Sequence, residues 1–146
     1  MDTGIARIYS KSFSEKGMNN VIKWEVQPIK DQQLIKIKFI NKGSFHRQGI
    51  WLKTDVGIEI PALSEEIYPS INLWEDTSPK EIICKCHSKN GYLSLYNIWD
   101  KGDGRQSQSY SSGMIVEEKE GNFIYNCNDF GFETNFDDLV FSIEKL

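Results

Sequence analysis

The sequence predicts an all-β protein, a single-domain antiparallel β-sandwich of about nine or ten short strands. Short apolar runs recur at spacings of roughly 8–15 residues between turn residues, a pattern shared by sandwiches and closed barrels. Within 34–40, Ile35, Ile37 and Phe39 alternate with lysines, as expected for a half-buried antiparallel strand. No amphipathic segment is long enough for three helical turns. Of the two architectures we expect the sandwich.

Taken in order, the elements follow from alternation and from turn residues. Asn90-Gly91 predicts a type I′ hairpin turn, because both central residues of that turn take positive φ. The stretch 61–79 has no clear period, and we expect a binding loop or Ω-loop there, with one helical turn capped by Ser64. A hairpin is expected around 118–122, and 106–112 is a further candidate for an edge strand. The expected strands are 5–10, 21–27, 34–40, 48–54, 56–60, 80–87, 92–99, 114–118, 123–127 and 139–144.

Length and charge restrict the function classes. The 146 residues suit one domain, spanning 1–146, with enough chain for a sizeable core. The net charge of −4 argues against a nucleic-acid partner, which requires a basic surface. No apolar run of about 18 residues predicts a transmembrane segment. The start lacks the basic and apolar regions of a signal peptide, so we expect a cytoplasmic protein, unless a leader has been removed or export uses another route. Nothing in the pattern indicates an oligomeric state.

Residues 125–146 carry the densest group of oxygen ligands, and they end in an apolar strand. Ca²⁺ takes six to eight oxygens from carboxylates and carbonyls, so one interpretation is a Ca²⁺ site that holds this loop. The alternative is a solvated turn, in which Asp137 or Asp138 accepts hydrogen bonds from backbone amides and directs the last strand. The spacing does not fit an EF-hand. The candidate metal ligands are Asp129, Glu133, Asp137 and Asp138.

The same region carries a resemblance. The runs Tyr125-x-Cys127-Asn128-Asp129 and Phe136-Asp-Asp-Leu-Val-Phe141, with 95–99 and 112–114 upstream, resemble the ending of a family of small uncharacterised bacterial β proteins. The second run is also similar to a signature of bacterial domains of unknown function that are suspected of binding calcium. That resemblance implies a calcium ligand set here. Where the signature begins with Asp, this chain has Asn135, which replaces a charged oxygen with a neutral one. No activity is implied.

A second group of polar and aromatic residues lies between 97 and 113. Carboxylates, amides and a flat ring gathered in loops are a usual means of holding a sugar, so a carbohydrate ligand is one expectation and a protein ligand the other. The alternative interpretation is a glycine-rich hairpin loop with Trp99 buried. The candidate ligand-binding residues are Trp99, Asp100, Asp103, Arg105 and Tyr110, together with Trp74 from the 61–79 loop.

The cysteines argue against a metal or catalytic centre. Cys84 and Cys86 are separated by one residue, a spacing that disfavours structural zinc, which uses Cys-x₂₋₄-Cys with a second pair. Each cysteine, Cys127 included, lies in an apolar strand where the thiolate is disfavoured. We therefore expect no disulfide framework and no cysteine nucleophile.

Together these features predict a non-enzymatic binding module that uses its loop end for a glycan or protein, with Ca²⁺ as the only candidate cofactor. The alternative is a bacterial accessory or immunity-type protein that binds a toxin through its acidic surface. A small hydrolase is the weakest interpretation, because no nucleophile and base are paired by spacing.

Overall fold

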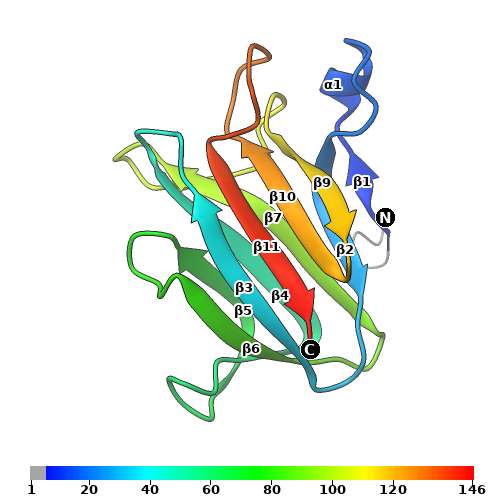
Figure 1. Ribbon diagram of the computed structural model, residues 1–146, viewed down its shortest axis with the longest axis vertical. Coiled ribbons are helices and arrows are strands. Elements are labelled where there is room, and N and C mark those ends of the chain that lie inside the picture. Colours follow the sequence, from blue (N-terminus) through cyan, green and yellow to red (C-terminus); the bar gives the residue numbers. More distant parts are fainter. Residues whose placement is uncertain (1–5) are drawn as a thin grey trace.

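The computed structural model describes residues 6–146, which form an all-β fold with one 11-stranded antiparallel sheet and one short helix. Figure 1 shows β10, β11 and β3 running side by side across the front of the molecule. The elements are β1 (Ile8–Tyr9), α1 (Lys11–Ser14), β2 (Ile22–Pro28), β3 (Gln33–Asn41), β4 (Arg47–Glu59), β5 (Ile67–Trp74), β6 (Glu81–His87), β7 (Tyr92–Asp100), β8 (Arg105–Gln106), β9 (Gly113–Lys119), β10 (Asn122–Asn128) and β11 (Leu139–Lys145).

The predicted sandwich is wrong, because the sheet closes into an antiparallel barrel of eight strands. The ring runs β2-β9-β10-β11-β3-β6-β4-β7, and β7 pairs with β2 to close it. The closing register runs from Glu25↔Leu95 to Pro28↔Tyr92. A strand with one buried face alternates identically in a sandwich and in a barrel. Closure depends on a pairing between segments far apart in the chain, which alternation does not encode.

The ring is uneven, because two of its junctions are short. β2 meets β9 through one residue pair, Ile22↔Met114, and β6 meets β4 only at 57–59. Three strands lie outside the ring: β1 pairs with β2, β8 with β7, and β5 with β4. The β2–β9 junction, with one residue pair, is therefore the shortest in the ring, and the β6–β4 junction, with three, is the next shortest.

The stretch 61–79 is not a simple loop, because it contains β5, which pairs with β4 from Gly49↔Trp74 to Glu59↔Ile67. Ser64 does not cap a helix there; its hydroxyl accepts a hydrogen bond from the Glu66 amide over 3.2 Å. Five of the eight β5 residues are exposed. The strand therefore lacks the alternation of apolar and polar residues that indicates a buried face. The two strands expected at 48–54 and 56–60 form one strand, β4, with an irregular register between Lys53 and Ile58.

The Asn90-Gly91 turn is present, but it is not a type I′ hairpin. Only Gly91 has positive φ, and β7 pairs with β2, β4 and β8 within residues 6–146, not with β6. Asp55 holds this turn, since its carboxylate accepts hydrogen bonds from the Ser88 hydroxyl (2.9 Å) and the Asn90 amide (3.0 Å). Burial alone raises the pKa of Asp55, but these bonds and one from Lys89 outweigh it, and the pKa falls below 3.8.

The expected hairpin around 118–122 is confirmed, since β9 and β10 pair up to Lys119↔Asn122. Its two central residues, Glu120 and Gly121, both have positive φ, the combination that a type I′ turn requires. The alternating strand is confirmed as well: Ile35, Ile37 and Phe39 are all buried. The barrel interior is filled by aliphatic and aromatic side chains from its strands.

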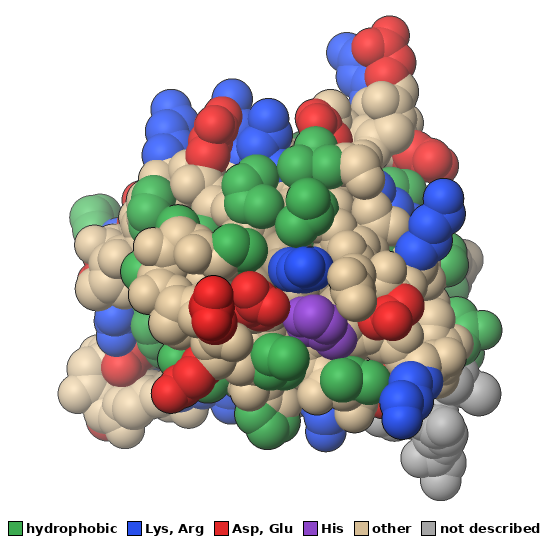
Figure 2. Space-filling model, turned by 90° about the horizontal axis from the view of Figure 1, so that it is seen from below, with side chains coloured by type: hydrophobic (Ala, Val, Ile, Leu, Met, Phe, Trp, Pro, Cys, Tyr) green, Lys and Arg blue, Asp and Glu red, His purple; other side chains and the backbone are tan. Residues whose placement is uncertain are grey.

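Within the described range, no helix is long and apolar enough to cross a membrane. Figure 2 views the molecule from below, toward the end opposite α1, and shows small hydrophobic groups interspersed with acidic and basic side chains.

Candidate functional site

The upper end of the barrel in Figure 1 gathers the loops on which most of the expected site residues lie. We call this the loop end; it consists of 42–46, 101–112 and 129–138. The short helix α1 also lies at this upper end of the molecule (Figure 1). The Ser10 hydroxyl accepts a hydrogen bond from the Phe13 amide and so caps α1. Phe13 is completely buried and packs against Phe132 and Phe136, with ring centroids 5.0 and 5.5 Å away.

Asn128, at the end of β10, joins two of these loops. Its side-chain amide donates to the carbonyls of Ser111 (2.7 Å) and Gly131 (2.8 Å), and its own carbonyl accepts from the Asn97 side chain over 3.1 Å. The Gly131 amide in turn donates to the Ser111 hydroxyl over 2.7 Å. Asn128 is 1% exposed; its bonds with Asn97 and Ser111 are buried, and the two bonds of Gly131 are partly buried. The two loops are therefore held in one arrangement by these hydrogen bonds.

Asp129 follows Asn128 and points into the barrel beside β4. Its Oδ2 accepts from the Gln48 side-chain amide over 2.8 Å and from the Ser44 hydroxyl over 3.4 Å. Its backbone amide donates to Asp138 Oδ2 over 2.9 Å, and its carbonyl accepts from the Ser109 hydroxyl over 3.1 Å. Asp129 therefore bonds to Ser44, Ser109 and Asp138, one residue from each of the three loops, and also to Gln48 on β4.

The Asp129 carboxyl is an unusual acid. It is 1% exposed, and burial, partly offset by the Gln48 hydrogen bond and assisted by the charge of Asp138, raises its pKa to about 6. Two buried oxygens next to this contact, Asp129 Oδ1 and Gln48 Oε1, have no hydrogen-bond partner among residues 6–146. An unpartnered buried carboxylate oxygen favours the protonated form. The site therefore binds a proton more tightly than an ordinary aspartate does.

The structure brings three of the four expected calcium ligands to one hollow and sets the fourth apart. Glu133, Asp137 and Asp138 line a surface hollow of about 410 Å³, whereas Asp129 does not line it. Across residues 6–146, no three histidine, cysteine, aspartate or glutamate side chains gather closely enough to hold a metal ion. Asp138 instead accepts the Asp129 amide, and the Asp137 carbonyl accepts the Gly43 amide over 2.9 Å. Asp138 thus shapes the turn into the last strand, which was the alternative interpretation.

The residues expected to hold a sugar are dispersed. Trp99 is 1% exposed and donates from its ring nitrogen to Gln106 over 3.2 Å, so it has no exposed face on which a sugar ring can stack. Asp100 accepts from the amides of Gly102 and Gly104 and closes the glycine loop. The Arg105 guanidinium donates to the Tyr96 hydroxyl over 2.8 Å. This is the glycine loop with a buried tryptophan, and nothing in its geometry supports a lectin.

Three of the expected ligand residues remain accessible to varying degrees. Asp103 is exposed at the tip of the glycine loop, and Tyr110 is 68% exposed. Trp74 is half-buried on β5, and the Arg47 guanidinium lies 4.3 Å from its ring centroid. Of the three, Tyr110 offers the largest exposed apolar surface.

Sequence reasoning missed two exposed phenylalanines at the loop end. Phe45 is fully exposed and Phe130 is 45% exposed. Both stand alone among polar and glycine neighbours, and a bulky apolar residue in a turn is the signal that would have identified them. We call Phe45, Phe130 and Tyr110 the aromatic rim.

Lysines lie over the aromatic surface of the loop end. The Lys101 ammonium is 3.9 Å from the Phe130 ring centroid, and the Lys16 ammonium is 4.5 Å from that of Phe132. Tyr110 packs edge-on against the same Phe132 ring at 5.6 Å. The His46 ring lies 6.0 Å from Phe130. The rim thus combines aromatic surface with charges of both signs, because Phe130 also lines the hollow of Glu133, Asp137 and Asp138.

A second polar cluster ties the start of the chain to the barrel. Arg7 forms two hydrogen bonds with the fully buried Glu25 carboxylate, at 2.7 and 2.9 Å. The Tyr125 hydroxyl donates to Glu25 over 2.8 Å and accepts from Gln27 over 2.9 Å. The bond with Glu25 raises the pKa of Arg7, and burial raises the pKa of Tyr125. All the polar groups here are mutually satisfied, which indicates a structural role.

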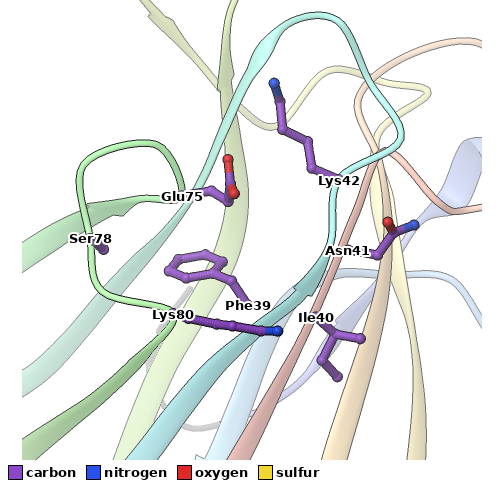
Figure 3. Close-up of a pocket in the computed structure, with 7 residues that line it drawn as sticks. All are labelled: Phe39, Ile40, Asn41, Lys42, Glu75, Ser78 and Lys80. Atoms are coloured by element: carbon purple, nitrogen blue, oxygen red, sulfur yellow. The ribbon is translucent and has the colours of Figure 1, made fainter.

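A further hollow of about 480 Å³ lies beside the end of β3. Figure 3 shows that Phe39 and Lys42 point toward the 75–80 loop, whereas Ile40 and Asn41 point away from it. The side chains do not converge on a common point, so this hollow is a poor ligand site.

The cysteines are unsuited to nucleophilic chemistry. All three are unpaired and buried. Burial raises the pKa of Cys84 and of Cys86 to about 12, and that of Cys127 well above 9.0. A thiolate is the reactive form of cysteine, so none of these side chains is activated.

No family model matches the chain, and searches of curated proteins and of solved structures find no match either. The family resemblance of the last residues stays a prediction.

Proposed function

We propose that the chain is a non-enzymatic protein-binding module that contacts its partner through the aromatic rim. The observation that carries this proposal is that Phe45, Tyr110 and Phe130 are exposed on loops that are fixed by the buried side chains of Asn128 and Asp129. Exposed aromatic residues dominate the binding energy of many protein interfaces.

Rigid loops strengthen this proposal. Binding by a mobile loop costs the free energy of ordering it, about 0.5–1.5 kcal/mol for each side chain immobilised. Here the Asn128 and Asp129 hydrogen bonds order the backbone of the 109–112 and 129–131 segments in the absence of a partner. For these two segments, the free energy that binding must still supply is that of ordering the rim side chains.

The charges define the partner surface that fits. Lys101 lies over the Phe130 ring, and the same ring borders the hollow lined by Glu133, Asp137 and Asp138. A complementary surface is therefore apolar at its centre and carries charges of both signs around it. Complementary charge directs orientation and accelerates association. A toxin neutralised by an immunity-type protein is one partner class with which such a surface is compatible.

The test is affinity capture from a lysate of the source cells with three baits. The first is the wild-type chain, and the second is a rim variant with Phe45→Ala, Tyr110→Ala and Phe130→Ala. The third is a matched control with Val56→Ala and Leu34→Ala, two exposed apolar side chains away from the rim. We expect one partner to be retained by the wild type and the control and lost by the rim variant.

A photo-crosslinker at position 45 or 110 should attach to the same partner, and its identity distinguishes a toxin from other proteins. Equal retention by the rim variant, or crosslinking only from position 34, would refute the proposal. Thermal melting of all three baits checks that the substitutions leave the fold intact.

A further inference from the structure

β5 and β6 are consecutive strands that do not pair with each other within residues 6–146. β5 pairs only with β4. β6 pairs with β3 along 81–86 but with β4 only along 85–87. The outer edge of β5 and the 81–84 edge of β6 are therefore left without a neighbouring strand. Unpaired edges present backbone amides and carbonyls that can accept another strand.

An apolar groove of about 540 Å³ lies between these two edges. Consecutive residues of each strand line it, Ile71 to Leu73 on β5 and Glu81 to Ile83 on β6. Side chains along a strand alternate between the two faces of the sheet. A hollow on one face would be lined by every second residue, so this groove lies in the plane of the barrel wall, between strand edges.

The remaining lining is mostly hydrophobic. Ile60, Leu63 and Tyr68 contribute apolar surface, and Leu63 is 76% exposed. Among residues 6–146, Glu81 is the only charged residue in the lining. Exposed apolar surface bordered by polar groups marks an interaction site.

We propose that this groove binds an extended, apolar segment of a partner protein, which adds as a strand between β5 and β6. A small apolar molecule would cover the side chains but leave the backbone groups of both edges unpaired. An extended peptide supplies main-chain donors and acceptors to both edges together with side chains for the groove. The occupant that satisfies the whole lining is therefore a peptide strand.

The structure limits the length and charge of that strand. The open β6 edge comprises 81–84. Paired strands both rise about 3.3 Å per residue, so a segment of roughly four residues can pair with this edge. Pro69 lies near the start of β5 and has no amide hydrogen to donate to an added strand. The part of β5 that can pair with an added strand is therefore 70–73. Glu81 is exposed and lies 3.9 Å from the Lys38 ammonium, so a lysine or arginine at the end of the segment would share its carboxylate with Lys38. The groove shares no residue with the aromatic rim, so the two surfaces are testable separately.

The first experiment is selection from a display library of random short peptides on the wild-type chain, with counter-selection on Ile83→Arg. The Val56→Arg variant is the matched control, because Val56 is an exposed β-branched residue outside the groove. We expect enriched sequences to be rich in valine, isoleucine and threonine with a basic end. They should bind Val56→Arg as tightly as wild type and Ile83→Arg at least about tenfold more weakly. Absence of any such enrichment would overturn the proposal.

The second experiment measures amide hydrogen exchange with the best enriched peptide and with the same peptide N-methylated at alternate amides. Within 70–73 and 81–84, the amides that point away from β4 and β3 should exchange about tenfold more slowly with the parent peptide. N-methylation should abolish this protection. Equal binding of the N-methylated peptide would show that side chains alone are recognised. Protection of both edges in the peptide-free protein, rising with protein concentration, would assign the groove to a second copy of the chain. Either result would refute strand addition by a partner.

Discussion

The Gln48 side-chain amide donates to Asp129 Oδ2 over 2.8 Å and connects β4 to the end of β10, 81 residues further along the chain. Asp129 is buried there beside Asp138, and its pKa is raised to about 6. The contact couples the loop end to the protonation of one carboxyl group.

Stability should therefore rise as the pH falls through 6. A folded-state pKa of about 6, above the ordinary 3.8, means that the folded protein binds this proton more tightly than the unfolded chain. The resulting stabilisation is complete below about pH 3.8 and is lost as the pH rises through 6, and its full size is about 2–3 kcal/mol. Urea unfolding between about pH 5 and pH 8 should show about 1–1.5 kcal/mol of this effect. This interval avoids the opposite effect of Asp55, whose lowered pKa acts at more acidic pH.

Asp129→Asn is the matched variant for this effect, because an amide keeps an acceptor for Gln48 but does not titrate. Its stability should be nearly independent of pH over the same interval and should exceed that of wild type at pH 8. An unchanged pH slope in Asp129→Asn would assign the dependence to another group.

Asn128→Ala should lower the free energy of unfolding by about 2–3 kcal/mol, because it removes the donors to the buried Ser111 carbonyl and the partly buried Gly131 carbonyl. Asn126→Ala, two residues away on β10 at a half-buried position, is the control and should cost about 1 kcal/mol or less. Denaturant titration compares the two. Similar losses would mean that the loop end is held mainly by other contacts.

Arg7→Ala should destabilise the protein by about 2 kcal/mol, because it leaves the Glu25 carboxylate buried without its cation. This loss is smaller than for a fully buried ion pair, because a third of the Arg7 side chain is exposed. In a Glu25→Gln background the same substitution should cost much less. A double-mutant cycle measures the difference. Additive effects would contradict a direct coupling of the two charges.

Thiol reagents should label the native protein very slowly. With a pKa of about 12 for Cys84 and Cys86, only about one such group in 10⁴ is ionised at pH 8, and burial also blocks access. Labelling should become fast in concentrated urea. Rapid labelling of one cysteine in the native state, located by mass spectrometry, would reveal an activated thiol and reopen a catalytic role.

Local pattern was sufficient for individual strands and for some turns. Alternation located β3, and the strands around Glu120-Gly121 were recognised because hairpin partners lie close in the chain. β5 was missed because its mostly exposed residues carry no buried face. The Asn90-Gly91 turn was assigned to the wrong type because Asp55, distant in sequence, holds its backbone.

At the candidate site, residue type alone was a poor guide to role. The acidic residues near the end of the chain suggested a metal, but Asp129 is buried inside the barrel whereas Asp137 lines a surface hollow. Trp99 suggested a sugar platform, yet it is buried. Exposure depends on which elements pack on a residue, and those elements lie far away in the chain.

The sequence by itself determined an all-β chain, most of its strands and its buried cysteines, because hydrophobic periodicity and turn chemistry act over a few residues. Only the tertiary structure decided that the sheet closes through the pairing of β2 with β7, that the raised pKa belongs to Asp129, and that β5 and β6 leave a gap in the wall. Each of these depends on contacts between distant segments, whose geometry is set by the packing of the whole barrel.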